Sequence, residues 1–365
     1  MSKQTRAVLT IIAGTIGVGF LALPYSIYHF GTFTGIIVLI IVGMLTIVTN
    51  IAYGDIITSD KGNRQIPGYV RKYLGDFPAH ITTFFIITGY LGILLAYGII
   101  AGSALRLLLF QIGVKLSASF LGLIFAISAL FLTKYGMKII AKVSSWAVIA
   151  LILAIIILLV VSLPEVDFSN ITSINLSSFS ALFGVSIFAM YSAGSIPNID
   201  EIIGYNKRKY RKAIIISNVL TIVIYVFFTL ILSLSIGSKL TDELINSFTA
   251  KHLFASKLMS ILTLLAVFTS FVSVSNNIKE VLTYDYKMPA RVSTFLISSV
   301  LVWFLAFEVF DFGQLLSKVG NFALALQSLA IFAVWFKSQT NTSVFYKTIV
   351  GICSVVLLFG MLSQI

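Results

Sequence analysis

The residues with the clearest chemical potential are three glycines, Gly14, Gly17 and Gly19, in the run AGTIGVGFLALPY (residues 13–25). Each weakens a helix by roughly 1 kcal/mol relative to alanine, and none has a side chain that keeps a ligand away from the backbone. A helix unwound here exposes amide donors at the start of its second half, where the dipole favours a carboxylate. Carbonyls at the end of the first half can receive a cation or an ammonium group. The alternative is that these glycines serve close helix packing.

A second segment of the same kind reads SIFAMYSAGSIPNIDEII (residues 186–203). Pro197 removes a backbone donor, Gly194 loosens the turn, and Ser192 and Ser195 supply hydroxyls. Alone, this segment is also compatible with an ordinary proline kink. Interrupted helices at corresponding positions of two halves indicate a transporter site built from inverted repeats, so the pair favours two discontinuous helices.

The elements that carry these segments are predicted to cross a membrane. Of 365 residues, 58% are hydrophobic and only 10% are charged, against about 25% charged in soluble domains. A crossing needs about 20 apolar residues. The sequence predicts an all-α integral membrane protein of eleven transmembrane helices, the first and sixth being discontinuous. The spans are residues 7–28, 33–54, 81–108, 118–133, 143–163, 178–200, 213–236, 257–278, 292–308, 314–336 and 345–363.

The basic residues predict the orientation. With the N-terminus inside, 19 of the 25 Lys and Arg residues fall in cytoplasmic segments, as the positive-inside rule requires. We therefore expect a multi-pass protein of the cell membrane, with a cytoplasmic N-terminus and the C-terminus outside. The net charge of +12 is spread over short clusters between spans, which favours the lipid bilayer as partner and argues against nucleic acid.

The sequence does not predict an enzyme. The single cysteine, Cys353, can form neither an internal disulfide nor a metal set. The three histidines are isolated, and no hydrolase, kinase, dinucleotide or zinc pattern occurs. We expect no cofactor.

Two runs of the sequence resemble a known family. GTIGVGFLALPY, together with AYGIIAGSAL (residues 96–105), is similar to the amino acid/auxin permease family of secondary amino acid transporters. The resemblance covers essentially the whole chain, but its motifs are loose and glycine-based, so it does not identify the substrate. It implies the leucine-transporter fold in one transmembrane domain, residues 1–365. Its 5+5 inverted repeat would comprise about residues 7–163 and about 178–336, with an extra helix at about 345–363.

The resemblance also implies where an amino acid substrate binds. Its carboxylate would lie on amides near Gly17, and its ammonium on carbonyls of the first and sixth spans. Tyr97 would hydrogen-bond the substrate or close over it, although ordinary packing remains the alternative for Tyr97 and Tyr191. The implied substrate-binding residues are Thr15, Gly17, Val18, Gly19, Tyr97, Phe188, Tyr191 and Ser192.

A sodium site is the second implication. Ala266, Thr269 and Ser270 fall on the carbonyl, hydroxyl and hydroxyl positions of the sodium-binding helix of this fold, with the carbonyls of Ala13 and Ile16 as partners. Spacing of i, i+3 and i+4 puts the three on one helix face, and hard cations prefer oxygen ligands. Serine and threonine are also common in helix packing within membranes.

Two positions bear on the choice of coupling ion. Several sodium-coupled animal members carry asparagine at the position of Ala13, which here offers only its carbonyl. The span 143–163 lacks the lysine that some proton-coupled relatives place there in lieu of sodium. We expect a secondary active amino acid transporter working by alternating access as a sodium symporter. The alternatives are proton coupling, exchange, or a non-transporting amino acid receptor on the same fold.

Overall fold

The computed structural model describes residues 2–61, 65–132, 137–247, 253–306, 311–339 and 343–363, and within these ranges the chain contains helices and no strand. The helices are α1 (Lys3–Thr15), α2 (Gly19–Phe30), α3 (Thr32–Asp60), α4 (Ile66–Leu74), α5 (Asp76–Phe110), α6 (Ala118–Leu132), α7 (Met137–Ser162), α8 (Phe179–Met190), α9 (Asp200–Ile203), α10 (Lys207–Ile236), α11 (Leu244–Ser247), α12 (Leu253–Glu280), α13 (Ala290–Ala306), α14 (Phe312–Lys318), α15 (Ala325–Ser338) and α16 (Val344–Leu362).

Seven segments of the described chain are long and apolar enough to cross a membrane, and α1 with α2 forms an eighth if the bent pair is one span. The seven are Thr32–Asp60, Asp76–Phe110, Leu176–Ile203, Lys207–Lys239, Phe254–Thr283, Phe312–Ser338 and Val344–Leu362. Shorter apolar helices occupy Ala118–Phe131 and Ile149–Glu165. The prediction of an all-helical, multi-pass membrane protein is confirmed, whereas the number eleven stays a prediction.

The helices present apolar side chains outward, as a lipid environment requires. On α3 the exposed residues Phe33, Ile37, Ile41 and Met44 follow helical spacing along one face. In lipid every backbone group must be paired within the protein, which a helix achieves by itself. The long apolar runs therefore become helices rather than open strands.

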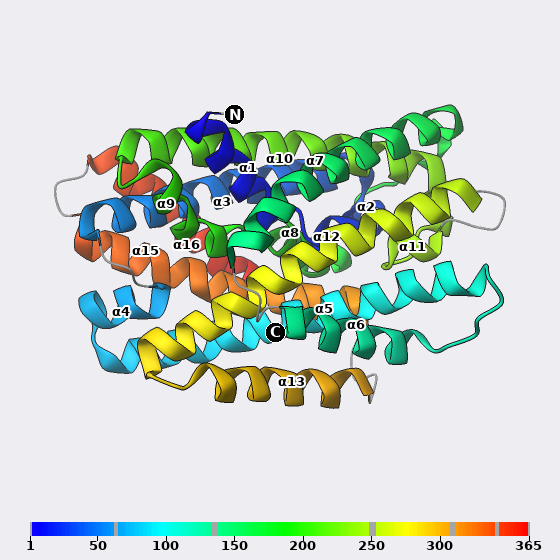
Figure 1. Cartoon of the computed structure of the whole chain (residues 1–365). Helices are drawn as coiled ribbons and strands as arrows, with labels where there is room; N and C mark the ends of the chain where they lie inside the picture. The colour runs from blue at the N-terminus through cyan, green and yellow to red at the C-terminus, as the bar shows by residue number, and fades with distance from the viewer. Residues whose placement is uncertain are drawn as a thin grey trace.

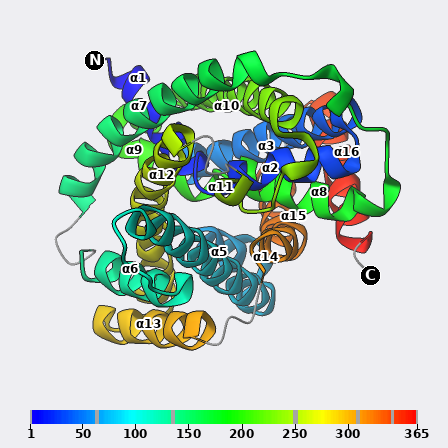
Figure 2. The same ribbon diagram turned by 90° about the vertical axis from the view of Figure 1, so that its right-hand side faces the viewer.

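The long helices lie side by side, with α4 at one end of the bundle and α11 at the other (Figure 1). We call these the α4 end and the α11 end. Seen along the bundle, α6 and α13 lie at one edge next to α5, and α16 lies at the opposite edge beside α3 and α8 (Figure 2). The breaks in α1–α2 and α8–α9 lie between these edges, where α1 contacts α10 and α12 and α2 contacts α8.

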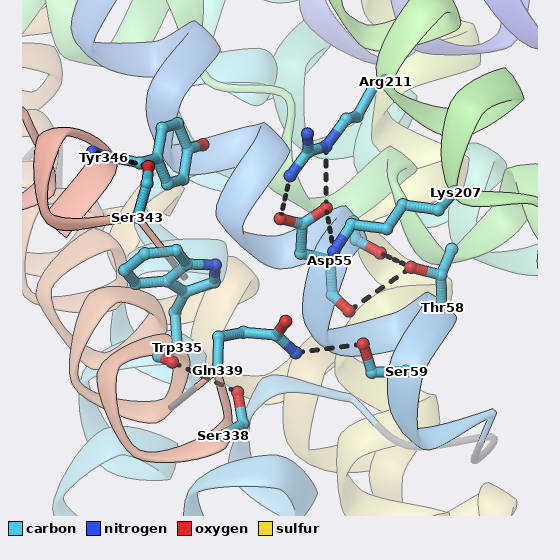
Figure 3. A network of polar contacts seen from close by, with 11 residues as sticks. Asp55, Thr58, Ser59, Lys207, Arg211, Trp335, Ser338, Gln339, Ser343 and Tyr346 are labelled. Atoms are coloured by element: carbon cyan, nitrogen blue, oxygen red, sulfur yellow. Dashed lines mark hydrogen bonds and ion pairs between the residues drawn. The ribbon is translucent and has the colours of Figure 1, made fainter. Parts of the chain in front are cut away.

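A buried carboxylate ties helices together near the α4 end (Figure 3). The side chain of Asp55 in α3 is 2% exposed and accepts hydrogen bonds from Arg211 of α10, Nε to Oδ1 at 3.0 Å and Nη2 to Oδ2 at 2.5 Å. The Nζ atom of Lys207 lies 3.4 Å from Asp55 Oδ1. The Arg211 guanidinium also lies over the Tyr346 ring of α16, 5.9 Å from its centroid. One acid thus joins two bases and fixes α3 against α10.

Candidate substrate and ion site

The first crossing is broken at its glycines. Helices α1 and α2 meet at 60°, and Ile16 takes a non-helical conformation (φ −76°, ψ 80°) while its amide bonds to the Ile12 carbonyl at 2.8 Å. The Gly17 amide closes a tight turn onto the Thr15 carbonyl at 2.8 Å. Because the first amides of a helix have no partner inside it, those of Val18 and Gly19 begin α2 as potential donors to an anion.

The sixth crossing is broken over a longer stretch. Helix α8 ends at Met190, Tyr191 is extended (φ −63°, ψ 121°), and two 3₁₀ turns, Ala193–Ser195 and Pro197–Ile199, precede α9. Pro197 stands at the start of its turn, where a missing amide costs nothing. Both predicted discontinuities are confirmed.

The two breaks touch each other. A Cβ atom at Gly19 would lie 2.5 Å from Cα of Ala189, and one at Gly14 would overlap the Ser195 hydroxyl. The hydroxyl of Tyr225 in α10 lies 3.3 Å from both the Thr15 and the Ala189 carbonyl oxygens, which are the ends of α1 and α8. The glycines are therefore needed for close approach, and Tyr225 bridges the two ends.

A small cavity lies where the breaks meet. Its volume is about 30 Å³, roughly that of one water molecule. Seven of the predicted residues line it: Thr15, Gly17, Gly19, Tyr97, Phe188, Tyr191 and Ser270. The other lining residues are Gly14, Ile93, Gly194, Ser195, Ser273, Val274 and Asn277. The breaks must separate further before an amino acid can fit.

Three of the predicted substrate-binding residues have side chains that are not available to a ligand. The Thr15 hydroxyl donates to the Ile11 carbonyl at 2.7 Å, so it is already engaged within α1. Ser192 is 1% exposed, does not line the cavity, and accepts a 2.6 Å bond from the Asn50 amide of α3. The side chain of Val18 is fully buried outside the lining set, leaving only its backbone for a ligand.

The predicted ion ligands lie in or just after α1 and on the neighbouring helix α12. Ile16 and Ala266 are each 1% exposed, and Ala13 is partly buried. Ser270 is 3% exposed, and among the described residues its hydroxyl has no partner in good hydrogen-bonding geometry, although the Tyr97 hydroxyl lies close enough to interact with it. A buried oxygen without a partner fits a cation ligand, since leaving it unsatisfied is costly. The side chain of Thr269 lies outside the described residues.

The sequence predicted Tyr191 at the cavity but not the two polar side chains that hold its hydroxyl, Tyr90 and Gln327. The hydroxyls of Tyr90 and Tyr191 share a 2.9 Å hydrogen bond, and the amide nitrogen of Gln327 donates to Tyr191 Oη at 2.8 Å. Helical spacing could have identified Tyr90, because it precedes Tyr97 by seven residues on α5, and this spacing puts both on one face of the helix. Nothing local marks Gln327.

A larger hollow of about 730 Å³ lies at the α11 end. Its wall carries Arg106 as well as the neighbouring acids Asp242 and Glu243. Asp242 accepts a 3.0 Å bond from the Gly313 amide at the start of α14. Burial raises the pKa of the Glu243 carboxyl, and the charge of Asp242 adds to that rise. This hollow carries charged side chains, whereas the inner cavity contains no charged side chain among its described lining residues.

Two broken membrane crossings that meet at a central cavity define a class of helical membrane transporters. The chain belongs to the family described as transmembrane amino acid transporter protein, which it matches over residues 2–365. Glutamine transporter 2 of Aliivibrio fischeri is 23% identical over 337 residues, covering 88% of this chain and 85% of that protein. Tyrosine-specific transport system 1 of Haemophilus influenzae is 24% identical over 393 residues, covering 99% and 96%.

Among solved structures, the crystal structure of MhsT in complex with L-phenylalanine superimposes with a TM-score of 0.69 at 14% identity, covering 99% of this chain and 98% of that one. This similarity shows the fold, which is that of the leucine transporter. The predicted family and fold are confirmed.

Proposed function

We propose that this protein is a secondary active transporter that carries amino acids by alternating access in symport with sodium. The observation that carries the proposal is the meeting of the two helix breaks at one small cavity. Unpaired backbone groups are tolerated at membrane depth only where they are buried in protein or line a cavity. A zwitterion supplies both charges that such backbone groups can bind.

The carboxylate binds amides near Gly17, those of Val18 and Gly19, where the α2 dipole is positive. The ammonium group binds carbonyls at the ends of α1 and α8, near Thr15 and Phe188. The Tyr97 hydroxyl, 2.6 Å from where a Cβ of Gly17 would stand, lies against the bound substrate. Membership of an amino acid transporter family supports this assignment, as do the names of the glutamine and tyrosine relatives.

The small volume of the cavity, about 30 Å³, supports alternating access, because an amino acid needs more room than this. Helices α1, α2, α3, α8, α9 and α10 rock against the remaining helices, which opens the cavity toward each end in turn. The distribution of basic residues makes the α4 end cytoplasmic. The protein lies in the cell membrane, and its C-terminus is on the outer side.

Sodium binds between α1 and α12 and links its gradient to the substrate. The ligands are the carbonyls of Ala13, Ile16 and Ala266 and the hydroxyls of Thr269 and Ser270. The Ser270 hydroxyl supports this site, because it is buried and has no partner in good hydrogen-bonding geometry among the described residues. Because Ser270 also lies beside Tyr97, the cation and the substrate stabilise one another.

The test is uptake of radiolabelled amino acids into proteoliposomes under an inward sodium gradient, compared with choline. We expect sodium-stimulated uptake that Thr269→Ala and Ser270→Ala each reduce by roughly ten-fold or more at low sodium. The control is Ser354→Ala on α16, whose hydroxyl bonds only to the Val350 carbonyl of its own helix, and it should leave uptake unchanged.

Other outcomes assign a different mechanism. Uptake that follows a proton gradient in choline, with Thr269→Ala silent, indicates proton coupling. Uptake that depends only on amino acid inside the vesicles indicates exchange. Saturable binding without flux into vesicles indicates a receptor.

A further inference from the structure

The cavity has a polar wall that backbone recognition of a zwitterion does not use. Tyr191 lines the cavity, and its hydroxyl is held between Tyr90 at 2.9 Å and Gln327 at 2.8 Å. Tyr90 is 3% exposed and Gln327 is 1% exposed. One end of the Gln327 amide has no hydrogen-bond partner, whichever way the amide is turned.

Asn277 of α12 completes this wall. It is 5% exposed and lines the cavity. Its amide nitrogen lies 2.7 Å from where a Cβ of Gly194 would stand, and the Tyr90 and Tyr191 hydroxyls lie 3.4 and 3.7 Å from the same point. Three polar groups therefore converge on the space that Gly194 leaves empty.

The wall is displaced from the zwitterion-binding backbone along both flanking helices. Asn277 follows Ser270 by seven residues on α12, and Tyr90 precedes Tyr97 by seven on α5. Seven residues rise about 10 Å in a helix. Since Tyr97 faces Gly17 and Asn277 faces Gly194, an amino acid held at the breaks directs its side chain toward the wall and the α4 end.

The chemistry of the wall is uncharged. Amide and phenol groups donate and accept hydrogen bonds, and no charged residue is among the described residues that line the cavity. The next acid along α12, Glu280, has its carboxylate bound by the Gln65 amide at 2.8 Å. A charged ligand side chain would be desolvated here without a counter-ion, and an aliphatic one would leave buried polar groups unpaired.

We propose that Tyr90, Tyr191, Asn277 and Gln327 form the side-chain subsite of the transporter. This subsite selects neutral amino acids whose side chain ends in an uncharged amide or hydroxyl. The inference rests on the proposed amino acid transport and deepens it. A site built to hydrogen-bond a substrate group rejects analogues that lack it far more strongly than an apolar pocket rejects a change of size.

The experiment compares glutamine with two ligands of similar size, methionine and glutamate, in proteoliposomes that contain the full chain. We expect wild-type uptake to favour glutamine by kcat/KM at least roughly ten-fold over both. Asn277→Leu and Gln327→Met keep side-chain volume and should lower glutamine uptake about ten-fold while methionine changes less than about three-fold. Gln111→Leu, an exposed amide at the end of α5, is the matched control and should alter neither.

A second variant protects the test against misfolding. Tyr90→Phe removes one oxygen and keeps the ring, and should reduce the preference for glutamine over methionine about three-fold. Thermal unfolding in detergent reports whether each variant is folded.

The outcomes separate the inference from the proposed function. Wild-type protein that transports methionine as well as glutamine would contradict the proposed subsite. Folded variants that lower the uptake of all three substrates by the same factor would contradict it too. In either case transport itself stands. A wild type that neither binds nor transports any amino acid overturns the proposed function instead.

Discussion

The two broken crossings use very different lengths of irregular chain. Only residues 16–18 separate α1 from α2, whereas residues 191–199 separate α8 from α9. The short break contains Gly17, is flanked by Gly14 and Gly19, and offers backbone groups. The long break also brings the side chains of Tyr191 and Ser195 into the cavity. We infer that the first break binds what all amino acids share, and that the second reaches what distinguishes them.

The largest expected effect is at Gly19, where the breaks are in contact. In Gly19→Ala the new Cβ would lie 2.5 Å from Cα and 2.9 Å from N of Ala189, and backbone cannot rotate away as a side chain can. Overpacking costs about 1–3 kcal/mol, so we expect substrate affinity and uptake to fall roughly ten-fold or more. Gly351→Ala on α16 is the control, since no atom lies within 4 Å of its added carbon. Wild-type affinity in Gly19→Ala would contradict the close contact.

Substitution of Gly17 should lower uptake nearly as much as substitution of Gly19, but a second substitution should restore part of the loss. A Cβ at Gly17 meets the Tyr97 hydroxyl at 2.6 Å, and the ring carbons only at 3.4 Å and beyond. Gly17→Ala should therefore lower uptake about ten-fold. Adding Tyr97→Phe should restore part of that loss, because it removes the clashing oxygen, whereas the same addition should not rescue Gly19→Ala. Kinetics of the two double variants test this difference.

Two serines of the long break form a pair with opposite expectations. Ser192→Ala deletes the acceptor of the 2.6 Å bond from Asn50, so it should cost about 1–2 kcal/mol of stability and change stability more than affinity. Ser195 lines the cavity, so Ser195→Ala should weaken substrate binding about three-fold with little change in unfolding temperature. Thermal unfolding and ligand titration distinguish the two variants. Equal effects of both variants on stability and affinity would contradict the assignment of Ser192 to Asn50 and of Ser195 to the cavity.

The smallest expected effect is at the bridge between the breaks. Tyr225→Phe removes a hydroxyl that lies 3.3 Å from each of two carbonyls, at the weak end of hydrogen bonding of about 0.5–1.5 kcal/mol. We expect about a two-fold loss of affinity in equilibrium titration. Tyr73→Phe on α4 removes a partly buried hydroxyl far from the cavity and should have none. A loss greater than that of Gly19→Ala would make Tyr225 a direct ligand.

The breaks were predictable because they depend on local backbone chemistry. Glycines at 14, 17 and 19, and Gly194 with Pro197, weaken a helix wherever it packs. Their helices end within a few residues of these positions. Pro24 shows the limit of that reasoning, since it lies inside α2 rather than at the break.

Side-chain partners were harder to predict because they depend on distant elements. Ser192 looked like a pocket hydroxyl, but its partner Asn50 lies 142 positions away. Gln327 meets Tyr191 across 136 positions, and α15 has no local feature that announces this. Helical spacing does place Tyr90 beneath Tyr97, but it cannot say which helix the shared face meets.

The carboxylate near the α4 end has a consequence for how this sequence can evolve. Asp55 forms ion pairs with both Arg211 and Lys207 while it is itself almost wholly enclosed. Losing the acid leaves two like charges facing each other, and losing the arginine leaves a nearly enclosed anion with one partner fewer. Exchanging Asp55 with Arg211 would put the new guanidinium beside Lys207. We therefore expect substitutions at these three positions to persist only when a second substitution restores the charge balance.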